Sequence, residues 1–414
     1  MDDLFTNPRR WADLDAWRRA AVALHAHGPI HRVESEHFGP FWAVITRDAI
    51  YDVERRPQVF TNAPEPVLAS RKAIAARPFA LRTLVHMDAP DHPKHRKLAQ
   101  DWFRGPSLEA MQGRLEALSA KAVTRLGEAG GGCDFVQAVA LRYPLEAILA
   151  ILGLPEQDYE LMLRLTQEMF GQEDPDLRRK GESRQVFGSA AKDIFQYFRQ
   201  VAEDRRARPT DDLASAIANG TVDGAPLSER DMLSYYLIIA TAGHDTTAYA
   251  MAGGMLALAA HPAQFQQLRR EPERLGAAVE EMFRWTTPAR HFMRTAAEDA
   301  EIAGQMVRAG EWIYLSYAAA NLDPAVFEDP LRFDITRPNA DRHATFGHGV
   351  HFCLGTQMAR MEMRSLFGAL VANLETLELG GEVAYSQTTT VGGAKRLPIR
   401  YALARGAAET GVRS

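Results

Sequence analysis

The spacing of apolar residues along the chain predicts a mainly helical protein. Apolar side chains recur every three or four residues, as they do on one face of a helix. This pattern predicts helices at residues 11–26, 108–126, 141–152, 156–170, 184–205 and 228–260. Short β-type runs predict strands at 41–45, 300–302, 312–316 and near 399–402. We therefore expect a mainly α fold with small β-sheets, of the α+β class, and a single domain over residues 1–414.

One long stretch, residues 61–87, has no clear period. Three prolines interrupt it, at positions 64, 66 and 78. So long an irregular run inside a compact chain is usually functional. We expect this segment to control access to a site.

Composition and charge narrow the range of partners. The chain has 414 residues, of which 46% are hydrophobic, and a net charge of −5 with acidic and basic residues interleaved. This balance gives no reason to expect a nucleic acid partner. There is no uninterrupted apolar run of membrane-spanning length and no signal-peptide pattern at the start. The two cysteines, Cys133 and Cys353, are far apart in sequence. We expect a soluble cytoplasmic protein without membrane contact.

The run from Phe346 to Gly355 (FGHGVHFCLG) carries the strongest chemical signal. Glycines at 347, 349 and 355 permit tight backbone conformations. A helical pattern follows from Thr356 to Leu374, so the start of a helix directs partial positive charge towards Cys353. A thiolate that binds a metal needs such a loop, because backbone N–H groups stabilise its charge. The run is typical of a thiolate ligand site.

Two other interpretations of this run remain. His348, His351 and Cys353 could bind zinc, but a structural zinc site needs four ligands and no second cysteine is near. A lone cysteine is more often buried and inert. That is the interpretation we prefer for Cys133, which precedes Asp134 at a predicted helix start.

A second signal lies inside the predicted helix 228–260, where residues 242–247 read AGHDTT. Glycine and adjacent hydroxyls can open a helix locally. An acid beside a hydroxyl in an apolar helix can form a proton relay, although Asp245 could also be an exposed helix residue. His244 and Asp245 could also belong to a metal phosphohydrolase site, but companion ligands are not evident. We assign no role to His244.

The residues Phe346, Gly349, His351, Cys353 and Gly355 resemble the haem-binding signature of the cytochrome P-450 family. The resemblance extends from about residue 41 to about residue 401. It implies the cytochrome P-450 fold, with haem b between the long helix 228–260 and the helix after the cysteine loop. It also implies that Cys353 is the metal ligand and that Asp245 and Thr246 are catalytic proton donors. The cofactor-binding residues that it implies are His92, Arg96, Ala242, Gly243, Arg294, Phe346, Gly347, His351, Cys353 and Gly355.

Three further residues are implied to support the cysteine loop. Glu281 and Arg284 are three positions apart, which places both side chains on one face of a predicted helix. The resemblance implies that they form a buried ion network with Arg337. The chain departs from the family at Leu322, where arginine is usual, and at Val307 and Arg308.

The resemblance implies a monooxygenase that hydroxylates a small hydrophobic substrate with O2. Within the family, the chain resembles bacterial terpineol monooxygenases, notably at residues 143–145, 240–247 and 391–395. This favours a terpenoid, alicyclic or aromatic hydrocarbon as substrate. A steroid or branched-lipid hydroxylase is the alternative, since residues 171–175 (GQEDP) resemble that group. The implied pocket residues are Ile239, Ala242, Ala289, Phe292, Thr390 and Val391.

The implied electron donors are a ferredoxin and a ferredoxin reductase, because 414 residues leave no room for a fused reductase. We expect a monomer. A peroxygenase is disfavoured, since such relatives tend to lack the acid–alcohol pair present here as Asp245 and Thr246. A haem-binding sensor or carrier without catalytic activity is the alternative from a different functional class.

Overall fold

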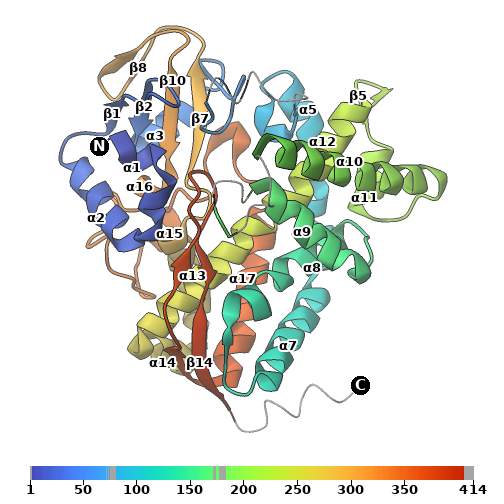
Figure 1. Cartoon of the computed structure of the whole chain (residues 1–414), viewed down its shortest axis with the longest axis vertical. Helices are drawn as coiled ribbons and strands as arrows, with labels where there is room; N and C mark the ends of the chain where they lie inside the picture. The colour runs from blue at the N-terminus through green and yellow to red at the C-terminus, as the bar shows by residue number, and fades with distance from the viewer. Residues whose placement is uncertain are drawn as a thin grey trace.

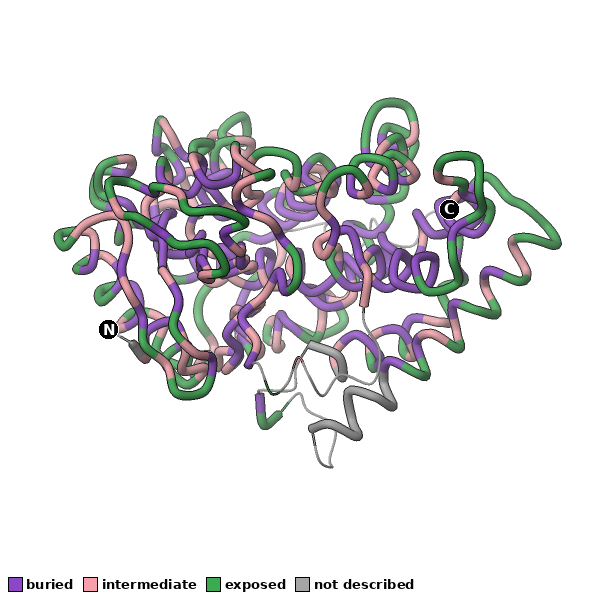
Figure 2. Tube along the Cα trace, turned by 90° about the horizontal axis from the view of Figure 1, so that it is seen from above, coloured by how far each residue is buried: buried purple, intermediate pink, exposed green. Residues whose placement is uncertain are grey.

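The computed structural model describes residues 2–70, 72, 74, 81–170, 174–176 and 183–404. A helical region and a region that combines strands with short helices lie side by side, and α13 (Asp245–Ala260) and α17 (Thr356–Asn373) run between them (Figure 1). Buried residues gather in the interior of both regions, and exposed residues form the rim (Figure 2). The predicted mainly helical fold with small sheets is confirmed.

The helical region follows the predicted periodicity closely. Its helices begin where side chains cap them: Asp212 accepts from the Ser215 amide, and Ser228 accepts from the Asp231 amide. The helices of this region are α5 (Asp91–Gln100), α6 (Gly105–Glu109), α7 (Gln112–Glu128), α8 (Arg142–Ile151), α9 (Tyr159–Phe170), α10 (Ser183–Ala207), α11 (Leu213–Ala218), α12 (Glu229–Ala242), α13, α14 (Pro262–Arg270), α15 (Leu275–Thr286) and α17.

A five-stranded sheet organises the other region. Its order is β1 (Ile30–Val33), β2 (Phe41–Val44), β10 (Trp312–Ser316), β7 (His291–Ala296) and β3 (Phe60–Thr61), with β2 and β10 parallel and the other pairs antiparallel. The short helices α1 (Asp2–Thr6), α2 (Leu14–His25), α3 (Arg47–Glu54) and α16 (Tyr317–Ala320) lie beside it (Figure 1). Strand β7 therefore runs inside the largest sheet of the described chain, next to the helical region.

Smaller sheets complete the fold. One has the order β11 (Leu374–Leu379), β14 (Pro398–Leu403), β4 (Gly132–Asp134). Three hairpins pair β5 (Thr221–Val222) with β6 (Ala225–Pro226), β8 (Ala300–Ile302) with β9 (Gln305–Val307), and β12 (Ala384–Tyr385) with β13 (Ala394–Arg396).

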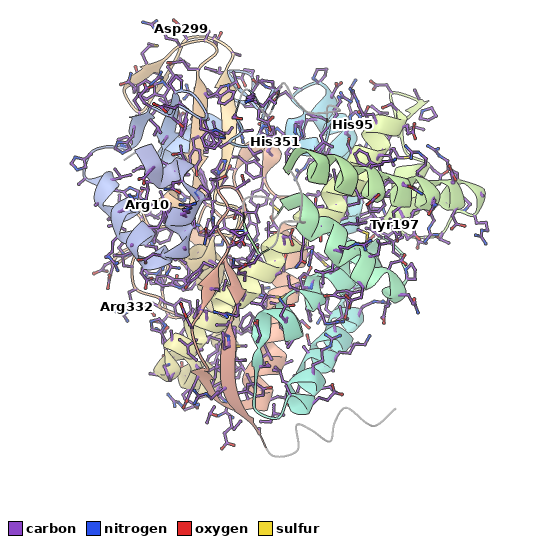
Figure 3. The ribbon with its side chains drawn as sticks, viewed as in Figure 1. Arg10, His95, Tyr197, Asp299, Arg332 and His351 are labelled. Atoms are coloured by element: carbon purple, nitrogen blue, oxygen red, sulfur yellow. The ribbon has the colours of Figure 1, made fainter. Side chains whose placement is uncertain are left out.

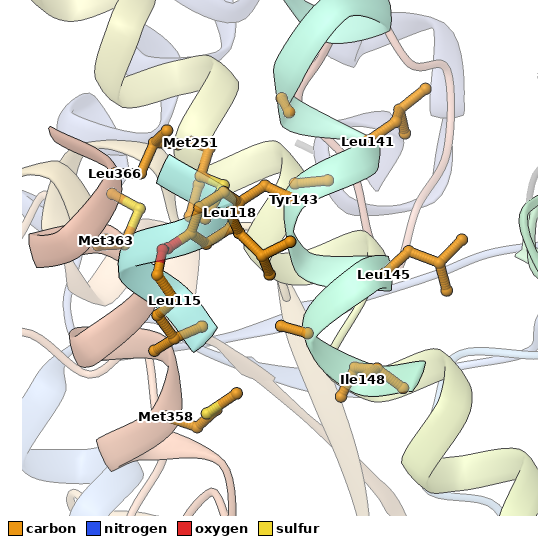
Figure 4. Close-up of a cluster of buried hydrophobic side chains, with 14 of the residues drawn as sticks. Leu115, Leu118, Leu141, Tyr143, Leu145, Ile148, Met251, Met358, Met363 and Leu366 are labelled. Atoms are coloured by element: carbon orange, nitrogen blue, oxygen red, sulfur yellow. The ribbon is translucent and has the colours of Figure 1, made fainter. Parts of the chain in front are cut away.

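The largest apolar cluster lies where α7, α8, α13 and α17 meet (Figure 4). Leu115 and Leu118 from α7, Met251 from α13 and Leu366 from α17 are buried together there. Each such side chain contributes about 1.5–3 kcal/mol when it leaves water. This packing holds α13 and α17 in a fixed relation near the cysteine loop.

Three expectations need correction. The predicted helix 228–260 is two helices, because Gly243 and His244 form a turn between α12 and α13. The predicted helix 108–126 is also two helices, because Ala110 and Met111 form a turn between α6 and α7. Cys133 precedes Asp134 at a helix start, as predicted, although Cys133 itself lies in β4, paired with Ile399 of β14. The predicted helix 156–170 begins as a 3-10 turn, and its α-helical part starts at Tyr159.

Part of segment 61–87, residues 71, 73 and 75–80, lies outside the described residues, as do residues 171–173 of the stretch 171–175. Within the part of the chain that the structure describes, no helix is both long and apolar enough to cross a membrane.

Candidate active site

Cys353 lies on a tight loop that ends at the start of α17. The Cys353 amide donates to the Phe346 carbonyl at 2.9 Å, which closes the loop. Gly347 and Gly349 have φ values of +67° and +68°, a conformation that L side chains rarely adopt. Gly355 differs from these two glycines, because its φ is −84° and a Cβ at this position would meet no protein atom within 4 Å.

The environment of the Cys353 thiol combines two opposing effects. Burial raises the pKa of this thiol, while the Gly355 amide and the Thr356 hydroxyl oppose that rise. The Cys353 residue is nevertheless solvent-accessible, so it is available to a ligand. The start of α17 adds partial positive charge on the same side. The loop is thus built to hold a thiolate whose charge a cation neutralises.

The structure does not support a zinc site at this loop. His348 stacks on the Tyr51 ring, with 4.4 Å between ring centroids. Among the described residues, no three histidine, cysteine, aspartate or glutamate side chains converge in a way that could hold a metal ion. Cys353 would therefore need a metal that arrives with its other ligands, as iron does in haem.

Two histidines next to the loop have unused nitrogens. The rings of His92, on α5, and His351 are 4.0 Å apart between centroids. The Nε2 atoms of both are buried without a hydrogen-bond partner among the described residues. Burial lowers the pKa of His92 to about 4 and that of His351 to about 2. Figure 3 labels His351 near the middle of the molecule, between β7 and α5.

Two arginines lie around these histidines. Arg96 donates from Nη2 to the Phe352 carbonyl at 2.6 Å, directly before Cys353. Arg294, on β7, donates to the Met293 carbonyl and to Glu54, at 2.8 and 3.0 Å. Its charge contributes to the lowered pKa of His351. Two buried nitrogens without partners and two guanidinium groups suit a ligand with two carboxylates, and the donor set therefore fits haem.

The break between α12 and α13 opens the long helix. Thr246 donates from Oγ1 to the Ala242 carbonyl at 2.7 Å, in place of a backbone donor. Ala242 is exposed, whereas the missing side chain of Gly243 leaves room for Ile148 of α8, whose Cδ1 would lie 2.6 Å from a Cβ there. Gly243 therefore permits helix packing on that side.

Asp245 follows the break and has a buried neighbour that sequence reasoning left without a role. Burial raises the pKa of Asp245, and His244 opposes the rise. The His244 Nδ1 atom is 3.3 Å from Asp245 Oδ1 and 3.2 Å from Thr166 Oγ1. Its Nε2 lies 3.1 Å from the Leu141 carbonyl, an acceptor, so Nε2 carries the proton. His244 thus links the helix break to α9 and to the start of α8.

Some of the predicted pocket residues lie next to one another in the structure. Ala289 and Val391 form an isolated β-bridge, and the adjacent Arg290 amide donates to the Thr390 carbonyl at 2.9 Å. Phe292 follows near the start of β7. Ile239 lies on α12 one turn before the helix break and is buried.

His291, between Arg290 and Phe292, connects this region to the segment that begins at residue 61. Its Nε2 accepts from the Leu68 amide at 3.0 Å, and its Nδ1 lies 3.2 Å from the Thr389 carbonyl. The ring stacks on Tyr314, with 4.2 Å between centroids. Burial lowers the pKa of His291 to about 3, so the ring is neutral near pH 7.

Glu281, Arg284 and Arg337 form the predicted buried ion network. Arg284 donates from Nε and Nη2 to the two oxygens of Glu281, both at 2.7 Å, and Arg337 Nε lies 3.2 Å from Glu281 Oε2. All three side chains are buried. The remaining N–H groups of the arginines reach backbone carbonyls, among them those of Asn321 and Glu328.

Sequence reasoning missed two carboxylates near the same loop. Glu280 binds Arg360 at 2.7 Å and lies 3.3 Å from His343, and these partners outweigh burial to lower the pKa of Glu280 to about 2. Its position beside Glu281 was the one available signal. Glu54 had none, because its partners Arg294 and Tyr317 are 240 and 263 positions away.

Comparison with known proteins agrees with this geometry. The sequence profile of the cytochrome P-450 family matches residues 48–391. Cytochrome P-450-terp from a Pseudomonas species is 35% identical over 410 residues, 95% of each chain. The steroid C26-monooxygenase of Mycolicibacterium smegmatis is 32% identical over 401 residues, 94% of this chain and 91% of that protein.

Solved structures give the same result. A crystal structure from Novosphingobium aromaticivorans has a TM-score of 0.90 and 40% identity, covering 97% of this chain and 98% of that one. A Mycobacterium marinum cytochrome P-450 in complex with pseudoionone has a TM-score of 0.88 and 32% identity, covering 95% and 97%. The protein is a haem-thiolate oxidoreductase, a monooxygenase whose cofactor is haem b. The chain belongs to the cytochrome P-450 family.

Proposed function

We propose that this monooxygenase hydroxylates a small terpenoid, alicyclic or aromatic hydrocarbon, using O2 and two electrons from a ferredoxin and its reductase. The observation that carries the proposal is the placement of Cys353 at the start of α17 together with Asp245 and Thr246 at the break of the long helix. We further propose that the chain acts as one domain and a monomer.

The cofactor, once bound, supplies the activation of O2 and the insertion of one oxygen atom into a C–H bond. Cys353 is the proposed iron ligand. His92, His351, Arg96 and Arg294 are the proposed partners of the haem carboxylates, and the unpartnered Nε2 atoms of the two histidines support this. Paired cations offset the cost of placing carboxylates in a buried site.

Asp245 and Thr246 are the proposed residues of proton delivery, with Asp245 as the donor and Thr246 as the acceptor that holds a water. The raised pKa of Asp245 lets its carboxyl group hold a proton, which is the state a donor needs. The Thr246 hydroxyl is committed to the Ala242 carbonyl, so its oxygen lone pairs can accept from a water. Thr246→Ala should divert consumed O2 to hydrogen peroxide, measured as the ratio of peroxide to hydroxylated product; an unchanged ratio would exclude this role.

The proposed substrate class is supported by the pocket and by two relatives. Ile239, Ala289, Phe292 and Val391 are apolar, and such a lining binds hydrocarbons. Cytochrome P-450-terp is one relative, and the other is a Mycobacterium marinum cytochrome P-450 solved in complex with pseudoionone.

A steroid hydroxylase is the second candidate, because the steroid C26-monooxygenases are 31–32% identical to the chain. A panel of monoterpenes, alkylbenzenes and sterols, followed by the spin-state shift of the Soret band, distinguishes the two. A sensor or carrier would bind a ligand without substrate-dependent consumption of reduced nicotinamide in the presence of ferredoxin and reductase.

The central experiment is a difference spectrum of the dithionite-reduced protein with carbon monoxide. We expect a strongly red-shifted Soret band that Cys353→Ala abolishes, with Cys133→Ala as the matched control that retains it. A histidine-type spectrum in the folded wild-type protein would refute thiolate ligation by Cys353.

A further inference from the structure

A buried carboxylate, Glu54, lies against the cysteine loop at the end of α3. Its Oε1 accepts from the Tyr317 hydroxyl at 2.6 Å and from Arg294 Nη2 at 3.0 Å. Only 4% of the residue is exposed. Its other oxygen, Oε2, has no hydrogen-bond partner among the described residues; the His348 amide approaches the carboxylate without reaching hydrogen-bond geometry. A carboxylate in this position is incompletely paired.

Glu54 is in contact with the loop that carries Cys353. A Cβ on Gly349 would lie 2.3 Å from the Glu54 carbonyl oxygen, and one on Gly347 would lie 3.4 Å from Glu54 Oε1. Both positions where the loop requires glycine therefore face this residue. A change of charge or position at Glu54 reaches the loop through direct contact.

Glu54 also binds Arg294, whose guanidinium group is proposed to bind a haem carboxylate. Arg294 donates from Nη1 to the Met293 carbonyl and from Nη2 to Glu54. If Arg294 also binds a haem carboxylate, one cation neutralises two acids. The net charge next to the cofactor then depends on whether Glu54 carries a proton.

The groups that face Glu54 determine whether its carboxyl group carries a charge near neutral pH. They are Arg294 on β7, Tyr317 on α16, the His348 amide in the loop, and Tyr51 on α3 itself. Burial raises the pKa of Glu54 to about 7, against the effects of Arg294, Tyr317 and His348. Burial also lowers the pKa of His348, which keeps that ring from supplying a positive charge near pH 7.

We propose that Glu54 is a positioning residue of the haem site that holds Arg294 and lowers the reduction potential of the iron, and that one proton binds Glu54 when one electron reaches the iron. This inference rests on the proposed binding of a haem carboxylate by Arg294. The electron comes from the one-electron donor of the monooxygenase reaction and the proton from solvent. The iron is reduced from the ferric to the ferrous state, and the Glu54 carboxylate becomes a carboxylic acid.

The test is the midpoint reduction potential of the substrate-free holoenzyme, measured by mediated dithionite titration. At about pH 8, Glu54→Gln should raise the equilibrium constant for reduction about tenfold, or about 59 mV, because a nearby negative charge is removed. At about pH 5.5 the difference should shrink, because wild-type Glu54 then carries a proton. The control is Glu311→Gln, which removes a carboxylate that binds Arg32 and Trp42 and should leave the potential unchanged.

Tyr317→Phe is the second variant, and it tests the proposal if Glu54→Gln does not fold. It removes a hydrogen bond that lowers the pKa of Glu54, so the pH at which the potential changes should rise. Equal potentials of wild type and Glu54→Gln at about pH 8, or the same difference at both pH values, overturn the inference. The carbon monoxide spectrum distinguishes failure of this inference from failure of the proposed function. If the reduced protein shows a thiolate-type band but its reduction potential does not respond to Glu54→Gln, only the role of Glu54 is refuted.

Discussion

Two buried ion networks flank the cysteine loop, and they differ in how completely their carboxylates are paired. Both oxygens of Glu281 accept short charge-assisted bonds from Arg284, and Arg337 adds a third contact. Glu54 receives two bonds on one oxygen and none on the other from the described residues. The two carboxylates are similarly buried, at 0% and 4% exposure, so burial alone does not distinguish them.

The difference indicates which network supports the fold and which responds to the solution. Removal of one partner of a fully paired buried carboxylate leaves an uncompensated buried charge. In a partly paired buried carboxylate, desolvation and the attraction of nearby cations nearly cancel. Its proton affinity therefore changes when the charge of its neighbours changes. We therefore assign the Glu281 network to stability and the Glu54 network to tuning of the site.

The largest expected effect is that of Glu281→Ala. The substitution leaves Arg284 and Arg337 buried without a counter-charge, which should cost about 3–5 kcal/mol of unfolding free energy. Denaturant unfolding of the purified protein measures it. The control is Asp299→Asn, which breaks an exposed pair with Arg308 and should leave stability unchanged. If both variants unfolded at the wild-type denaturant concentration, the Glu281 network would have no structural role.

An intermediate effect is expected from Gly349→Ala. Alanine there must adopt a φ of +68° and its Cβ would lie 2.3 Å from the Glu54 carbonyl oxygen. Strain of this kind costs about 1–3 kcal/mol, and relief of the close contact displaces α3 or the loop. Gly304→Ala is the matched control, since its φ is also positive, at +83°, and nothing lies within 4 Å of a Cβ at that position. Thermal unfolding and haem retention measure both, and equal behaviour of the two variants would contradict the proposed contact.

The third prediction concerns the pH dependence that Glu54 contributes to stability. Its pKa in the folded protein, about 7, lies above the usual value of 4.5, so the folded state binds more protons between these pH values. The unfolding free energy of the wild type should therefore fall relative to Glu54→Gln as pH rises from about 4.5 to about 7, and the difference should be constant above that range. Parallel pH profiles of the two apoproteins would show that Glu54 does not titrate there.

The comparison also shows what a sequence can predict here. Glu281 and Arg284 are one helical turn apart, and the family resemblance supplied Arg337 as their partner, so this network was predictable. Glu54 gave no signal, because its partners come from a strand and a helix more than 200 positions away. The break at Gly243 was missed as a boundary because apolar helical spacing resumes directly after residue 247, although the hydroxyl that stabilises the break was recognised.

Strand β4, which contains Cys133, shows the same limit of prediction from sequence. Three residues in β4 pair with β14, some 265 positions later, and no local pattern marks so short a strand. Local rules predicted helices well because a helix satisfies its own hydrogen bonds. Elements that depend on distant partners were predicted only where family resemblance supplied the partner.

The neutral ring of His291 makes the protein sensitive to acid in a defined way. From β7, its Nε2 accepts from the Leu68 amide, and its Nδ1 lies next to the Thr389 carbonyl. A proton on Nε2 would break the bond to the Leu68 amide. Because the pKa of His291 falls from 6.5 to about 3 on folding, the unfolded chain binds the extra proton first, and stability falls as pH drops from 6.5 towards 3. Acid near pH 3 should therefore also loosen the junction between residues 289–292 and the segment after residue 61, because the folded protein then binds a proton at His291.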